Sequence, residues 1–138
     1  MSGQAFTFVD IDGNTLQFDS LRYERPGASG SDGEWVACRI TFYAKDICHT
    51  VDATFLTSDL VDLKRVMELA LQGDDVQYES TEPWVHFEFS KDGSHIDILS
   101  RLSIMLGLGP IIEYNFECRE DEIKNTLCDL IRVVETFP

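Results

Sequence analysis

Alternating apolar and polar positions mark several segments of the chain as strands. In the segment 35–43, Val36, Cys38, Ile40 and Phe42 fall on one face of a strand, and the residues between them fall on the other. Apolar runs also flank Asp12-Gly13, which is typical of a hairpin turn because glycine adopts positive φ at little cost. The first half of the chain is thus predicted to form strands at 6–11, 16–18, 35–43 and 49–55.

Two other segments carry apolar residues at spacings of three and four, which is typical of amphipathic helices. The first begins near Leu56, where Thr57 or Ser58 is the expected N-cap, and ends at Gly73. The second spans about 120–136 and has acidic residues in its first turn. Each helix has one apolar stripe to bury, so both are expected to cover a sheet.

Further strands are predicted between the helices, at 83–89, 94–105 and 111–119, joined by turns that contain glycine. Neighbouring strands joined by short turns indicate antiparallel pairing. The predicted fold class is therefore α+β: an antiparallel meander sheet of about six to seven strands with two amphipathic helices packed on one face. A length of 138 residues favours a single domain over 1–138.

The charge balance narrows the classes of partner. Lys and Arg number 11 against 25 Asp and Glu, a formal net charge of −14. This charge repels phosphates and anionic lipids, so we expect neither a nucleic acid nor a membrane as partner. The N-terminal residues lack the basic and apolar regions of a secretory signal, and a cytoplasmic location is expected.

The four cysteines are Cys38, Cys48, Cys118 and Cys128, and none lies in a C-x-x-C pair. Two disulfides with three possible connectivities would suit an oxidising compartment. The favoured interpretation is free thiols in a reducing cytosol, because Cys38 and Cys118 fall on apolar faces of predicted strands. No metal and no cofactor are expected.

Aromatic and charged residues gather on the polar faces of the predicted sheet. Tryptophan, tyrosine and arginine contribute disproportionately to binding energy, so such a face can bind a protein partner. It can also be an ordinary solvated surface. The candidate partner-binding residues, including an acidic group after the first helix, are Trp84, His86, Glu88, Glu82, Asp74, Asp75, Tyr43 and Arg39.

From Trp35 onward the chain resembles the WapI-type immunity proteins of bacterial polymorphic-toxin systems. The matching features are Trp35-Val36, the helix start at 56–60, the stretch 78–88 with its Glu-Pro pair, and the ending Phe137-Pro138. Trp84 departs from the pattern, because the family commonly has a small or polar residue there. The resemblance supplies no catalytic residue.

The resemblance implies a non-enzymatic protein that occludes a cognate toxin domain. Our own hypothesis is that Trp84, with nearby acids, anchors this contact. An acidic protein of this kind suits a basic toxin, because opposite charge speeds association. The alternative is a small-molecule-binding or enzymatic α+β domain that uses the face of His86 and Glu88. In solution we expect a monomer or a weak homo-oligomer.

Overall fold

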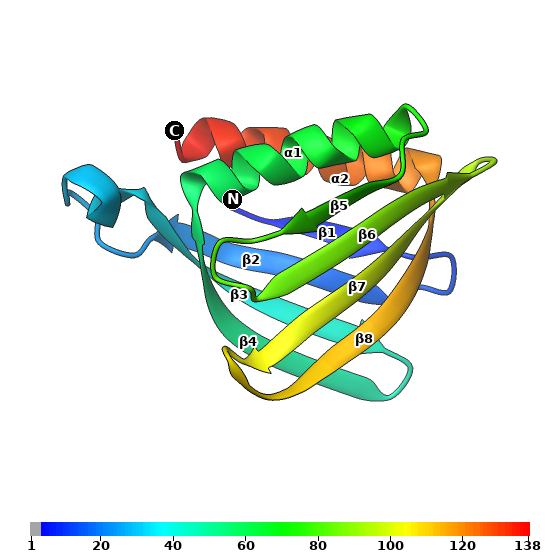
Figure 1. Cartoon of the computed structure of the whole chain (residues 1–138), viewed down its shortest axis with the longest axis horizontal. Helices are drawn as coiled ribbons and strands as arrows, with labels where there is room; N and C mark the ends of the chain where they lie inside the picture. Colours follow the sequence, from blue (N-terminus) through cyan, green and yellow to red (C-terminus); the bar gives the residue numbers. More distant parts are fainter. Residues whose placement is uncertain (1–3) are drawn as a thin grey trace.

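The computed structural model describes residues 4–138, which form eight strands, two α-helices and one short 3-10 helix (Figure 1). The strands of the first half are β1 (Phe6–Val9), β2 (Thr15–Tyr23), β3 (Trp35–Ala44) and β4 (Ile47–Leu56), and η1 (Gly30–Glu34) precedes β3. The helix α1 (Thr57–Leu71) leads to β5 (Val76–Glu79), β6 (Val85–Asp92), β7 (His95–Met105), β8 (Leu108–Arg119) and α2 (Glu120–Thr136).

The strands form two antiparallel sheets, which corrects the prediction of one meander sheet. The first sheet has the order β1-β2-β3-β4 and the second the order β5-β6-β7-β8. The α+β class and the antiparallel pairing are confirmed. The single sheet was wrong because α1 separates β4 from β5, so the second set of strands starts a sheet of its own. The strand β5, which we had interpreted only as part of an acidic segment, completes that sheet.

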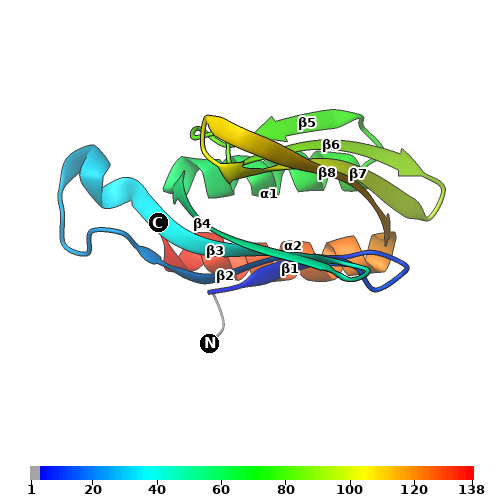
Figure 2. The same cartoon turned by 90° about the horizontal axis from the view of Figure 1, so that it is seen from below.

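The two sheets face each other, and the helices close one of the open sides between them (Figures 1 and 2). Helix α1 packs along β5, and α2 packs along β1. The helices therefore cover one edge of each sheet as well as part of the interior. A hydrogen bond of 2.6 Å from the Thr126 hydroxyl to the Thr7 carbonyl fixes α2 to β1.

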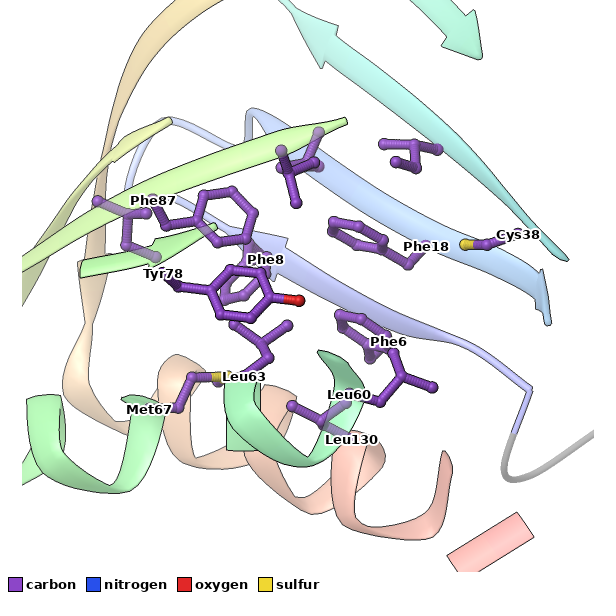
Figure 3. Close-up of a cluster of buried hydrophobic side chains, with 14 of the residues drawn as sticks. Phe6, Phe8, Phe18, Cys38, Leu60, Leu63, Met67, Tyr78, Phe87 and Leu130 are labelled. Atoms are coloured by element: carbon purple, nitrogen blue, oxygen red, sulfur yellow. The ribbon is translucent and has the colours of Figure 1, made fainter. Parts of the chain in front are cut away.

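Aromatic side chains from both sheets meet in the interior (Figure 3). Phe8 of the first sheet and Phe87 of the second have ring centroids 5.5 Å apart. Leu60, Leu63 and Met67 of α1 are buried against this group. The apolar positions that alternate along the strands are therefore the residues packed between the two sheets, and the helices cover one open side of this interior.

The predicted ends of α1 are only partly correct. Gly73 follows the helix with a φ of 102°, as expected, and Asp74 donates its N–H to the Leu69 carbonyl at 3.1 Å. At the start, Leu56 is the N-cap in place of Thr57 or Ser58. Its N–H is bound by the buried Asp59 carboxylate at 2.9 Å, so the capping group comes from inside the first turn.

Candidate partner-binding surface

The outer face of the second sheet carries polar residues in rows that cross all four strands. Strand register places Glu79, His86, Arg101 and Glu113 opposite one another in the first row. We call this surface the acidic face. Its residues are Gln77, Glu79, His86, Glu88, Ser90, Asp97, Leu99, Arg101, Glu113, Asn115 and Glu117.

A continuous set of contacts between carboxylates and nitrogen-bearing side chains runs across the acidic face. The His86 Nδ1 atom lies 3.2 Å from the Glu79 carboxylate, and its Nε2 atom lies 3.4 Å from Glu88. Arg101 then binds Glu88 at 3.2 Å through Nη1 and Glu113 at 2.9 Å through Nε. Each basic side chain lies between two carboxylates, so the basic groups are held in place on the sheet.

The balance of charge on this face is strongly negative. The rows defined above hold the acids Glu79, Glu88, Asp97, Glu113 and Glu117 and the nitrogen-bearing residues Arg101 and His86, and the next row of the register adds Asp92, His95 and Arg119. The hydrogen bond that Arg101 donates to Glu113 raises the pKa of the guanidinium. Arg101 thus stays charged and offsets part of the repulsion among the acids, and the surface keeps a net negative charge because the carboxylates outnumber the basic groups.

Two open hollows lie on the acidic face. One, of about 400 Å³, is lined by Asp75, Glu88, Asp97 and neighbouring residues. The other, of about 420 Å³, is lined by Glu79, His86, Arg101, Met105 and Ile111, among others. Met105 is 59% exposed and Ile111 is 58% exposed, so the second hollow has an apolar rim. Carboxylates beside exposed apolar residues are suited to a basic protein surface.

A family comparison assigns the chain. The model of the immunity protein WapI-like family matches residues 7–138. The chain belongs to this family. The resemblance to this family, noted in the sequence from Trp35 onward, therefore covers nearly the whole chain. No curated protein and no solved structure matches it.

In this WapI-like protein, three of the predicted partner-binding residues lie together. His86 and Glu88 belong to the acidic face, and Asp75 lines the hollow beside Glu88. Asp74 is exposed at the end of α1, next to Asp75 in the chain. The acidic segment after the first helix therefore borders the acidic face.

Two predicted residues of the WapI-like chain have mainly internal contacts. Trp84 is partly buried and packs against the core, and its Nε1 atom is buried with no hydrogen-bond partner among the described residues. The Glu82 carboxylate accepts a hydrogen bond from the Thr54 hydroxyl of β4. Both residues lie in the connection before β6, where packing and the connection to the first sheet determine their orientation.

The remaining two predicted residues lie on the first sheet. Tyr43 and Arg39 are exposed on β3, and Arg39 lies 3.8 Å from Asp52 of β4. The outer faces of the two sheets point away from each other (Figure 2). The grouping of Tyr43 and Arg39 with His86 and Glu88 on one surface was therefore wrong, because that grouping assumed a single sheet.

Sequence reasoning missed Glu79 and Arg101 as members of the site. Arg101 could have been found, because the buried residues Ile96, Ile98 and Leu102 of β7 imply that Arg101 faces outward. Glu79 required recognition of β5, where Val76 and Tyr78 alternate with polar residues over a short stretch. Both signals were present in the strand alternation.

Metal sites, membrane-spanning helices and disulfides were considered over the residues that the structure describes. No group of three or more His, Cys, Asp or Glu side chains is placed to hold a metal ion. Neither α1 nor α2 is long and apolar enough to cross a membrane. All four cysteines are free thiols: Cys38 and Cys118 are buried, as expected, and Cys48 and Cys128 are exposed.

Proposed function

We propose that this protein is a non-enzymatic immunity protein that neutralises a cognate bacterial toxin domain by binding it directly. Membership of the immunity family supports a protein toxin as the partner. The acidic face is the proposed principal contact, and the partner surface is basic. The observation that carries this choice is the gathering of five carboxylates on one surface: Glu79, Glu113 and Glu117 are exposed, and Glu88 and Asp97 are half-buried.

Charge gives the proposed contact a definite kinetic signature. A protein with a net charge of −14 attracts a basic partner over distances of several ångströms, and salt screens this attraction. We therefore expect the association rate to fall as ionic strength rises. Dissociation depends more on the apolar rim formed by Met105 and Ile111.

The test compares two double variants with equal changes in charge. The bait protein captures its partner from a lysate of the native cells, and the partner is identified and expressed as a separate domain. Glu79→Lys with Glu117→Lys alters the acidic face. Asp62→Lys with Glu135→Lys changes exposed positions on the helices by the same total charge. The first pair should reduce the association rate at least about tenfold at low salt, and the second should change it much less.

Neutralisation is measured in the same series, by growth of cells that produce the toxin domain together with each variant. Equal loss of association in both double variants would show that only the net charge matters, and would remove the acidic face from the proposal. Failure of the wild-type protein to neutralise the identified domain would contradict the immunity function itself.

A second candidate function is small-molecule binding in the hollow beside His86, which is favoured by the charged and polar side chains of Glu79, His86 and Arg101 that line it together with apolar residues. In this case at least one compound from a metabolite library would bind the wild-type protein and raise its melting temperature. The same metabolites would not stabilise an Arg101→Met variant, which keeps the unbranched apolar stem of the side chain but loses the guanidinium donors. The cytoplasmic location and the monomeric or weakly oligomeric state belong to the proposal as well.

A further inference from the structure

The four sheet edges of the molecule are protected to different degrees. The edge of β1 is covered by α2, whose Thr126 hydroxyl binds the Thr7 carbonyl. The edge of β5 is covered by α1, and the Tyr78 hydroxyl binds the Asp59 carbonyl at 2.9 Å. The strand β8 contains Pro110, which lacks an N–H, and its Glu117 carbonyl accepts the Ile11 N–H at 2.9 Å.

The edge of β4 has none of these protections at its N-terminal end. Residues Ile47 to Thr50 are all exposed, so neither face of this part of the strand is covered. The stretch from Ile47 to Val51 contains no proline, lysine or other formally charged residue. Natural proteins usually protect a long free edge with such residues, so an unprotected edge indicates a surface that pairs with another chain.

The hairpin geometry shows which backbone groups are free. Ala44 and Ile47 pair across a two-residue turn, and pairing continues from there along β3 and β4. In an antiparallel hairpin of this type, Ile47, His49 and Val51 direct their backbone groups toward β3, and the residues between them direct theirs away. The free groups belong to Cys48, Thr50 and Asp52. Within residues 4–138 these three groups have no backbone partner on the far side of β4.

We propose that the free edge of β4 binds an extended basic segment of the partner protein as a fifth strand of the first sheet. This inference rests on the proposed function in taking the partner to be a protein with basic character. The edge lies on the side opposite the helices (Figure 1), and its free part ends before Thr54, whose hydroxyl binds the Glu82 carboxylate in the connection before β6. Apolar side chains of the added strand would continue the buried row of Val51 and Ala53, and basic side chains would lie beside Asp52, whose side chain is 89% exposed and lies 3.8 Å from Arg39.

Charge distinguishes this occupant from a second copy of the chain. Two copies would bring together molecules that each carry a net charge of −14, whereas a basic segment reduces the charge of the complex. Strand addition also needs only backbone hydrogen bonds for affinity, with alternate side chains giving specificity. The β4 edge is therefore a second contact, separate from the acidic face.

The test uses a capped decapeptide of alternating valine and lysine as the probe, with the isotopically labelled full chain. We expect the amide protons of Cys48, Thr50 and Asp52 to exchange with solvent at least tenfold more slowly when the peptide is bound. The amides of Ile47, His49 and Val51 already bind β3, so their exchange should not change. This alternation identifies strand addition, because general electrostatic binding would not produce it.

Three further comparisons make the result decisive. Thr50→Pro removes one free N–H without removing a hydrogen bond to β3, and should weaken peptide binding at least tenfold, whereas Thr50→Ala should change it less than twofold. A peptide N-methylated at alternate residues gives the same comparison without any change in the protein. A valine and glutamate peptide should bind at least tenfold more weakly than the lysine peptide.

Unchanged exchange at Cys48, Thr50 and Asp52 in saturating peptide would overturn the proposal. So would protection of these amides in the free protein that grows with protein concentration, because a second copy would then occupy the edge. Neither result bears on the immunity function, since no toxin is present in this experiment. If the wild-type protein failed to neutralise the toxin domain, the immunity function would be wrong, but the peptide result would still show strand addition at β4.

Discussion

The side-chain amide of Asn14 donates a hydrogen bond of 2.6 Å to the hydroxyl of Tyr114, across 100 residues of sequence. Asn14 lies at the turn between β1 and β2, and Tyr114 lies on β8 of the other sheet. The same amide donates to the Asp10 carboxylate at 3.1 Å, and the side-chain Oδ1 atom of Asn14 accepts the Lys45 N–H at 3.1 Å. Asn14 thus joins two turns of the first sheet to the edge of the second.

Replacement of Asn14 by alanine should lower the free energy of unfolding by about 2 kcal/mol, because the buried Asp10 carboxylate loses one of its donors, and the Lys45 N–H and the Tyr114 hydroxyl each lose a partner. Denaturant titration measures the change. Asn125→Ala, at an exposed position on α2, is the control and should change stability by less than about 0.5 kcal/mol. Equal effects of the two substitutions would contradict a special role for Asn14.

Asp59 has a similar role between α1 and the second sheet. One carboxylate oxygen accepts the Leu56 N–H, and the other accepts both the N–H and the hydroxyl of Thr81, at 3.0 and 2.7 Å. Asp59→Ala should therefore cost about 3 kcal/mol of unfolding free energy. Asp62→Ala, one turn later and exposed, should have little effect, and a small change in the Asp59 variant would refute the capping role.

Substitutions of Trp84 test whether this residue stabilises the fold or contacts the partner. Trp84→Ala should lower the unfolding free energy by about 2–3 kcal/mol, because an aromatic side chain that packs on the core is lost. Trp84→Phe removes the unpartnered Nε1 group and should leave stability unchanged within about 1 kcal/mol. Affinity for the toxin domain is then compared in the phenylalanine variant, where folding is preserved. Reduced affinity there would restore Trp84 as a contact residue.

The buried thiols predict a loss of stability at high pH. Burial raises the pKa of Cys118 from 9.0 to about 12, and it also raises the pKa of Cys38. The folded state therefore retains the Cys118 proton between pH 9 and 12, whereas the unfolded state releases it. The contribution is constant below pH 9, and the unfolding free energy then falls by about 1.4 kcal/mol per pH unit for this thiol.

Chemical denaturation at pH 7, 9, 10 and 11 measures this slope. Cys118→Ala should lower stability at pH 7 but reduce the slope above pH 9 by the contribution of one thiol. Cys128→Ala is the matched control, because Cys128 is exposed on α2. An identical slope in the wild-type protein and the Cys118 variant would show that this thiol does not control the alkaline transition.

Local features of the fold were predictable, because they depend on neighbouring residues. Turn chemistry at Asp12-Gly13 and the spacing of apolar residues in α1 depend on φ preferences and helical periodicity alone. The strand β2 shows the limit of this reasoning. It continues to Tyr23 through an irregularity near Ser20, whose φ is 55°, and this shifts the apolar alternation from Phe18 to Leu21.

The presence of two sheets could not be predicted from alternation. An apolar strand face has the same sequence pattern whether it packs on helices or on another sheet. The contact between Phe8 and Phe87 could therefore not be predicted from the alternation around them. For the same reason His86 and Glu88 were placed correctly beside each other, whereas Tyr43 and Arg39 were assigned to the wrong surface. The site depends on which strands are neighbours, and that is a property of long-range packing.

The bond between Thr126 and Thr7 has a consequence for the order of folding. The first sheet is synthesised early, but the helix that covers its β1 edge is synthesised last among the described elements, and Phe137 also packs on Tyr23 with ring centroids 5.1 Å apart. A nascent chain without α2 therefore exposes the apolar side of β1. The early hairpins can form during translation, but the first sheet is sealed only after α2 leaves the ribosome, so the final step of folding follows synthesis of the C-terminal helix.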